Sequence, residues 1–290
     1  MTQPQSTPPL IGVDQLATML GAPGVAIVDG SWYLPSSGRN PDADYAAAHI
    51  PGAMRLPLER ISDPDSTLPH MLPSAVRFAS ACEEIGIGPR HHVIVYDGSG
   101  VNLSAARIWW TFRAFGHSHV SVLDGGILAW AGATRPIQVG VQRPVRTGYP
   151  VPQVDAALVV DRATIDRVVA GNEPGQIADC RSEDRFHGRA AEPRPGLRRG
   201  NIPGSVNTPF GQFTDQATGL MHGPERLRQI LAERGLDPSR RIISSCGSGV
   251  TACVLALAVE VIRASDPGAV GPPVAVYDGS WAEYGQAART

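Results

Sequence analysis

The sequence predicts an α/β protein of two similar domains, each a mostly parallel sheet flanked by helices. Two observations support this prediction. Short apolar strands alternate with helical patterns along the chain, which is typical of a parallel sheet covered on both faces. Segments of the first half also recur, in the same order, in the second half. Such a repeat indicates an internal duplication.

The individual elements follow from the spacing of apolar residues. In the first half, short apolar runs predict strands at 26–29, 93–96 and 120–123, and apolar periodicity predicts helices at 14–20, 74–85 and 104–115. In the second half, the same criteria predict strands at 177–179, 242–245 and 274–277, with helices at 162–170, 224–234 and 251–263. The two halves therefore have the same alternating order of elements.

The duplication is visible as four matched blocks, about 150 residues apart. Four matches in one order are hard to obtain by chance, so we expect two similar domains over 10–138 and 158–290. The stretch 139–157 between them is rich in proline and lacks a helical period, which is typical of a linker. The matched pairs are 25–29 with 175–179, 48–53 with 200–205, 93–101 with 242–250, and 122–130 with 276–284.

Size and composition limit the possible functions. The 290 residues exceed one ordinary core, and 42% are hydrophobic, enough for packed interiors. The net charge of −2 and the lack of a basic block argue against nucleic acid as the main partner. No apolar run reaches the length of a membrane span. The first residues have neither a basic start nor an apolar core, so we expect no signal peptide and a cytoplasmic location.

The cysteine and histidine patterns predict neither a metal site nor a cofactor. The four cysteines have no CxxC spacing, and no histidine pair has the helical spacing of a zinc protease. We expect reduced thiols. Cys82 and Cys180 are interpreted as structural, and Cys253 as buried, with a redox partnership as the alternative for Cys253.

Cys246 is the candidate nucleophile. It follows an apolar strand and opens the loop Cys-Gly-Ser-Gly-Val-Thr-Ala, and a strongly helical stretch comes directly after. Backbone N–H groups converge at such a turn and favour an anion, so we expect an available thiolate. The alternative is a small buried hydrophobe. A packing position, however, does not require the flanking Gly247 and Gly249, which are poor for helix and strand.

The duplication supplies an internal control for this hypothesis. At the position of Cys246, the first half has Asp97. A carboxylate cannot act as a sulfur nucleophile, and it repels an anionic substrate. The sequence therefore predicts that the second domain carries the chemistry and that the first is a non-catalytic scaffold.

Several motifs together resemble the two-domain sulfurtransferases of the rhodanese family. These are the Cys-Gly-Ser-Gly-Val-Thr loop at 246–251 and the paired Ile-Pro-Gly segments at 49–52 and 201–204, with family-like segments at 29–35 and 277–281. The resemblance implies two rhodanese-like domains. It also implies a mechanism in which Cys246 takes sulfur from a small donor, holds it as a persulfide, and passes it to an acceptor. The family's acceptors are a thiol, such as thioredoxin, or cyanide.

The loop also indicates which donor the resemblance favours. Thiosulfate enzymes of the family resemble Cys-Arg-Lys-Gly-Val-Thr, whereas Gly247 and Ser248 stand here in place of the two cations. A site without those charges should hold dianionic thiosulfate less well. The resemblance therefore implies 3-mercaptopyruvate as donor, with thiosulfate as the alternative. The loop positions that the resemblance implies to bind substrate are Gly247, Gly249, Val250 and Thr251.

The resemblance further implies a clamp and a proton relay. Arg185 and Arg194 match the two family arginines that bind the donor's carboxylate and carbonyl, and a guanidinium suits that task. The alternative is a solvated charged loop. The relay would consist of Ser248, His70 and Glu59, where Glu59 replaces the more usual aspartate. For His70, the alternative is that it only fixes a loop between the domains.

Two other classes of function remain as alternatives. A related fold houses cysteine phosphatases, which need an arginine after the cysteine loop. Position 252 is Ala252 here, and no arginine occurs before Arg263, so a phosphoryl group would lack its clamp. A non-catalytic sulfur carrier or interaction module is the other alternative, and the intact Cys246 loop argues against it.

Overall fold

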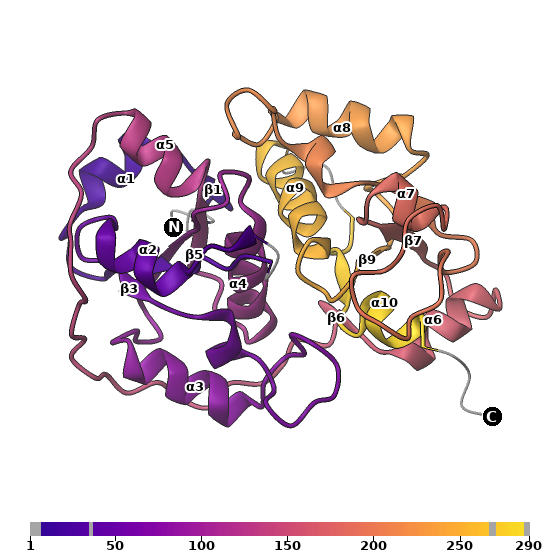
Figure 1. Ribbon diagram of the computed structural model, residues 1–290, viewed down its shortest axis with the longest axis horizontal. Coiled ribbons are helices and arrows are strands. Elements are labelled where there is room, and N and C mark those ends of the chain that lie inside the picture. Colours follow the sequence, from indigo (N-terminus) through magenta and orange to yellow (C-terminus); the bar gives the residue numbers. More distant parts are fainter. Residues whose placement is uncertain (1–6, 35–36, 267–270, 287–290) are drawn as a thin grey trace, which may run out of the picture. The chain divides into compact units, whose positions relative to one another are not determined.

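The computed structural model describes residues 7–34, 37–266 and 271–286, which form two compact units (Figure 1). Unit 1 consists of the described part of Met1–Ser62 together with Pro73–Val154 and Asp215–Met221. Unit 2 consists of Asp63–Leu72, Asp155–Thr214 and the described part of His222–Thr290. Each unit contains one five-stranded sheet in which all neighbouring strands are parallel. The predicted α/β class is confirmed.

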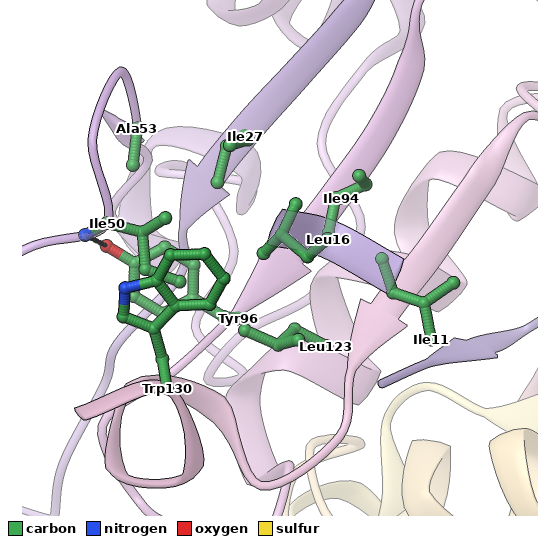
Figure 2. Packing of buried hydrophobic residues seen from close by; sticks show 9 residues of the cluster. All are labelled: Ile11, Leu16, Ile27, Ile50, Ala53, Ile94, Tyr96, Leu123 and Trp130. Carbon is green, nitrogen blue, oxygen red and sulfur yellow. Dashed lines mark hydrogen bonds between the residues drawn. The ribbon is translucent and has the colours of Figure 1, made fainter. Parts of the chain in front are cut away.

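Unit 1 has the strand order β1-β5-β4-β2-β3. Its strands are β1 (Leu10–Ile11), β2 (Val25–Asp29), β3 (Met54–Arg55), β4 (His92–Tyr96) and β5 (Val120–Leu123). Its helices are α1 (Val13–Met19), α2 (Pro41–Ala47), η2 (Leu58–Ile61), α3 (Ala75–Glu84), α4 (Leu103–Ala114) and α5 (Gly126–Gly132). Leu16 of α1 and Trp130 of α5 join Ile94 and Tyr96 in one buried core (Figure 2). Ile94 and Tyr96 share a face because strand side chains alternate.

Unit 2 repeats this arrangement with the order β6-β10-β9-β7-β8. Its strands are β6 (Val159–Val160), β7 (Gln176–Asp179), β8 (Val206–Asn207), β9 (Ile242–Ser245) and β10 (Ala275–Tyr277). Its helices are α6 (Arg162–Val169), α7 (Glu183–Phe186), η3 (Phe210–Phe213), α8 (Pro224–Glu233), α9 (Ala252–Ser265) and α10 (Ser280–Tyr284). Ile165 of α6 and Trp281 of α10 pack in its core.

All the strands and helices predicted from periodicity are present, with small shifts at their ends. The predicted strand at 274–277, for example, begins at Ala275. The sequence did not predict the two-residue strands β1, β3, β6 and β8, which are too short to show an alternation. Between 139 and 157 the chain forms no helix or strand.

Each unit contains a short segment from the other half of the sequence. We call Asp63–Leu72, which belongs to unit 2, the 63–72 strap, and Asp215–Met221, which belongs to unit 1, the 215–221 strap. A backbone hydrogen bond closes each strap: Asp63 N–H donates to Met71 O at 2.9 Å, and Asp215 N–H donates to Leu220 O at 2.8 Å. Each strap follows a 3₁₀ helix, η2 or η3.

The topology places three potentially reactive or charged side chains of unit 2 at one edge of its sheet. Asp179 ends β7, Cys246 follows β9, and Asp278 follows β10. Because the strands are parallel, their carboxyl ends meet at the same edge, where ligands bind in open α/β sheets. None of the helices in the described part of the chain has the length and apolar character that crossing a bilayer requires.

Candidate functional site

Cys246 lies in a tight loop between β9 and α9, with its side chain buried. Ser280 of α10 holds both ends of this loop, because its Oγ accepts the N–H groups of Cys246 and Gly249, each at 3.1 Å. The same hydroxyl donates to Tyr277 O at 2.8 Å. Trp281 N–H donates to Cys246 O at 3.0 Å. The loop is therefore fixed by the first turn of α10 rather than by its own side chains.

The remaining loop residues lead into α9. Gly249 has φ +75°, a backbone conformation that favours glycine. Val250 is buried, and its carbonyl accepts Cys253 N–H at 3.2 Å. Thr251 stands at the N-cap of α9. The predicted strand–loop–helix around Cys246 is therefore present.

Arg185 of α7 lies directly over this loop. A β-carbon at position 247 would lie 2.9 Å from Arg185 Nη2, so the missing side chain of Gly247 makes room for the guanidinium. Arg185 is also paired with Glu192, with Nη2 2.6 Å and Nε 3.3 Å from the carboxylate oxygens. The guanidinium is thus held against the cysteine loop on one side and against a carboxylate on the other.

Arg194 is the second cation near Cys246. Its guanidinium is partly buried, and burial lowers its pKa, while the charge of a Cys246 thiolate acts in the opposite direction. Arg185 also lowers this pKa, because the two positive charges repel one another. Arg185, Arg194 and Cys246 therefore lie within electrostatic range of one another. The role of the two arginines as a substrate clamp stays a prediction.

A buried network behind Arg185 was missed from the sequence. Glu192 bridges Arg185 and Arg181, with Arg181 Nη1 2.8 Å from its carboxylate. Arg181 pairs in turn with Asp179 at 2.6 Å and stacks 4.3 Å from the ring centroid of Trp281. The side chains of Asp179, Arg181 and Glu192 are all at most 2% exposed. One feature of the sequence could have indicated this network: Glu192 is an acidic residue between Arg185 and Arg194 in a basic segment.

Ser248 and His70 lie next to each other in unit 2. His70 Nδ1 lies 3.1 Å from Ser248 Oγ, although the two residues are far apart in the sequence. The contact forms because the 63–72 strap belongs to this unit. Glu59 lies in η2 of unit 1, where its carbonyl accepts from Arg77. Its place in the relay stays a prediction.

The other cysteines are buried. Burial raises the pKa of the Cys180 thiol well above its usual value, and the neighbouring Cys246, Asp179 and Cys253 act in the same direction. Burial likewise raises the pKa of Cys82. Cys253 is fully buried, as predicted, and its Sγ donates to Gly249 O at 3.2 Å. In residues 7–34, 37–266 and 271–286, no three His, Cys, Asp or Glu side chains are grouped to hold a metal ion.

The family model of the rhodanese-like domain matches this chain twice, over residues 12–133 and 164–287. The chain belongs to the rhodanese-like family. Human 3-mercaptopyruvate sulfurtransferase is 38% identical over 294 residues, covering 100% of this chain and 96% of the relative. The protein of the same name from Escherichia coli K12 is 37% identical over 284 residues, covering 97% and 96%.

Solved structures agree with this assignment. The crystal structure of SseA from Escherichia coli, described as a 3-mercaptopyruvate sulfotransferase with the rhodanese fold, matches with a TM-score of 0.82 and 35% identity. The match covers 96% of this chain and all of that one. The Tum1 protein of Saccharomyces cerevisiae matches with a TM-score of 0.86 and 28% identity, covering 97% and 95%.

In the first rhodanese-like repeat, the loop that corresponds to the Cys246 loop is occupied by its own Asp97 side chain. The buried carboxylate of Asp97 accepts hydrogen bonds from Ser99 N–H and Ala105 N–H at 2.8 Å, and from Ser99 Oγ at 2.6 Å. A β-carbon at Gly98 would collide with Tyr33 Oη, so Tyr33 lies over this rhodanese loop as Arg185 lies over Gly247. Burial raises the pKa of Tyr33 to about 12, which keeps it neutral.

Proposed function

We propose that this protein is a 3-mercaptopyruvate sulfurtransferase that works through a persulfide on Cys246. The observation that carries the proposal is the position of Arg185 over Gly247, beside the nucleophile and near Arg194. An anionic donor can bind there with its sulfur next to Cys246. Relatives with this name that are 37–38% identical over nearly the whole chain support the same activity.

The first half-reaction moves one sulfur atom to the enzyme. The Cys246 thiolate attacks the thiol sulfur of 3-mercaptopyruvate, an S–S bond forms, and the C–S bond breaks. The electron pair of that bond passes to the carbon as the enolate of pyruvate. A proton then transfers to this carbon, which releases pyruvate and leaves a persulfide. The two arginines stabilise the carboxylate and the enolate oxygen electrostatically.

The Ser248–His70 pair accounts for the proton. The donor thiol has to lose a proton, and the enolate carbon has to gain one. Ser248 stands two residues after the nucleophile, and His70 Nδ1 is within hydrogen-bonding distance of its hydroxyl. His70 takes up the proton through Ser248 and returns it to carbon. Glu59 is proposed as the third, acidic member of the relay.

The second half-reaction returns the enzyme to its starting state. The sulfur atom of an acceptor thiol, such as thioredoxin, or the carbon of cyanide attacks the outer sulfur of the persulfide. The S–S bond breaks, and its electron pair returns to Cys246 as the thiolate. Cys246 is buried, so the acceptor has to reach the outer sulfur, which extends beyond the Cys246 side chain.

Thiosulfate is the second candidate donor. A relative from Arabidopsis thaliana named thiosulfate/3-mercaptopyruvate sulfurtransferase is 37% identical over 295 residues, covering 95% of this chain and 76% of the relative. The two arginines could also hold this dianion. Gly247 and Ser248, however, add no positive charge to the loop, so thiosulfate should bind more weakly.

A comparison of kcat/KM for the two donors tests the proposal. The enzyme is assayed with each donor at the same pH and ionic strength, with dithiothreitol as the common acceptor. We expect a preference for 3-mercaptopyruvate of roughly a hundredfold, since an oriented carboxylate clamp is worth a few kcal/mol. A preference for thiosulfate would replace the proposed donor, and inactivity with both would reject the proposal.

A further inference from the structure

Both straps are tied to their units by an equivalent aspartate. In unit 2, the Asp278 carboxylate accepts Leu72 N–H at 2.6 Å. In unit 1, the Asp124 carboxylate accepts Met221 N–H at 2.9 Å. Asp124 follows β5 and Asp278 follows β10, at matching places in the two repeats. The same hydrogen bond therefore occurs twice in the molecule, once on each side of the duplication.

The straps differ in the residue two positions before this bond. The 215–221 strap has Gly219 there, with φ +73°, and a β-carbon on it would collide with the carbonyl of Gly100. The 63–72 strap has His70, with φ +60°. Both backbones are left-handed, a conformation that costs a residue with a side chain about 1–2 kcal/mol. A strained histidine persists only where its surroundings hold it.

The surroundings of His70 provide this hold. Met71 O, directly after His70, accepts from Asp63 N–H, and Leu72 N–H donates to Asp278. The bond to Asp278 is short and involves a charged acceptor, which makes it stronger than an ordinary amide bond. Asp278 is only 2% exposed, so water competes little for this bond. The strap is thus fixed within two residues of the imidazole that meets Ser248.

We propose that Asp278 is a positioning residue, which holds the 63–72 strap so that His70 reaches Ser248. The expected effect of Asp278 on turnover rests on the proposed function, in which His70 moves a proton. Asp124 makes the same bond to a strap that has glycine in place of the histidine. A comparison of Asp278 variants with Asp124 variants therefore separates the positioning of His70 from the general stabilising effect of the strap hydrogen bond.

The experiment compares Asp278→Asn and Asp278→Ala with the matched controls Asp124→Asn and Asp124→Ala in the full chain. With 3-mercaptopyruvate as donor, we expect kcat to fall about tenfold in Asp278→Ala, less in Asp278→Asn, and KM to change less than about twofold, because the arginines are untouched. The Asp124 variants should lower Tm but keep kcat. Equal kcat losses in both series would overturn the proposal.

A double-mutant cycle with His70→Ala adds a readout that a general structural defect would not change. If Asp278 acts through His70, Asp278→Asn should cause no further loss of kcat in the His70→Ala background. An undiminished loss there would overturn the proposal. Asp278→Asn keeps an acceptor for Leu72 N–H, so the cycle does not depend on Asp278→Ala being folded.

NMR of the His70 imidazole tests the positioning without any turnover. We expect its ring signals in Asp278→Asn to move in the direction seen for Ser248→Ala, and to be unchanged in Asp124→Asn. Unchanged ring signals in Asp278→Asn would overturn the inference. This measurement remains decisive if the wild-type chain transfers no sulfur, a result that would reject the proposed function alone.

Discussion

The two β-strand-to-helix loops at Asp97 and Cys246 occupy matching places in the two repeats and differ in how their amides and side chains are used. In unit 1 the loop amides of Ser99 and Ala105 donate to the Asp97 carboxylate, so the anion that the loop accepts is its own side chain. In unit 2 Ser280, from outside the loop, accepts two loop amides, and position 246 carries a thiol. In unit 1 an outside hydroxyl also takes part, because Gly98 N–H donates to Ser31 Oγ at 2.9 Å. The two copies therefore differ chiefly in the side chain at the cysteine position, a carboxylate in unit 1 and a thiol in unit 2.

The side chains that lie directly over the two loops also differ. Neutral Tyr33 lies over Gly98, whereas the Arg185 guanidinium lies over Gly247. Gly126 stands where unit 2 has Ser280, and a β-carbon there would collide with the carbonyl of Asp97. Arg39 also reaches the first loop, where its Nη1 donates to Gly98 O at 3.0 Å and its guanidinium stacks on Tyr33. The difference is therefore that Tyr33 fills the space over Gly98, whereas a guanidinium occupies the corresponding space over Gly247.

The largest expected effect comes from substitutions at Cys246 and Asp97. Cys246→Ser should lower sulfur transfer by roughly a thousandfold or more, because the nucleophile is lost. Asp97→Cys in that background should restore nothing, since Tyr33 replaces the arginine over the first loop. It should also lower the free energy of unfolding by about 2 kcal/mol, because buried charged hydrogen bonds are lost. Activity assays and urea titration check both, and activity in the double variant would contradict the comparison.

The next effect concerns the clamp. Arg185→Ala and Arg194→Ala should raise KM for 3-mercaptopyruvate by roughly tenfold to a hundredfold, the effect of one lost charged hydrogen bond. The rise should be smaller for thiosulfate, which has no carboxylate. Arg189→Ala is the matched control, because Arg189 lies in the same segment, is exposed, and pairs with Asp184. Equal changes for both donors, or a change in the control, would count against the clamp.

A smaller effect is expected at the paired left-handed positions of the straps. Gly219→Ala should destabilise the protein by about 2 kcal/mol, because the backbone is left-handed and a β-carbon collides with Gly100. Gly211→Ala is the control, because a β-carbon added at Gly211 would meet nothing within 4 Å apart from its chain neighbours. At the other strap, His70→Gly should be more stable than His70→Ala by about 1 kcal/mol, although both lose turnover. Equal stabilities of the two His70 variants would show that the histidine is unstrained.

The smallest expected effect is a loss of folding stability at acid pH that comes from two histidines of unit 1. Burial lowers the pKa of His92 and of His117 in unit 1, and neighbouring histidines add to the shift. Well above pH 6.5 these histidines are neutral in both the folded and the unfolded chain, so they contribute no pH dependence there. As the pH falls below 6.5, the unfolded chain binds protons more readily than unit 1, so stability falls. His92→Gln with His117→Gln should reduce this loss in urea titrations at pH 7.5 and 5.5, and an unreduced loss would contradict the assignment.

Local patterns in the sequence predict the central strands and the cysteine loop, because β4, β9 and their helices have clear apolar periods. The duplication identifies Asp97 as the counterpart of Cys246 without any relatives. Patterns of this kind do not predict the Arg185–Glu192–Arg181 network or the hold of Ser280 on the loop. These depend on contacts between segments far apart in the chain. The Ser248–His70 contact followed only from the family resemblance, since no local pattern places a residue of the first half in the second unit.

The most direct test is the intact mass of the protein after incubation with 3-mercaptopyruvate and removal of the donor. The account predicts an increase by one sulfur atom, located on the peptide that contains Cys246 and absent in Cys246→Ser. An unchanged mass while pyruvate accumulates, or sulfur located on Cys82, Cys180 or Cys253 instead, would contradict it.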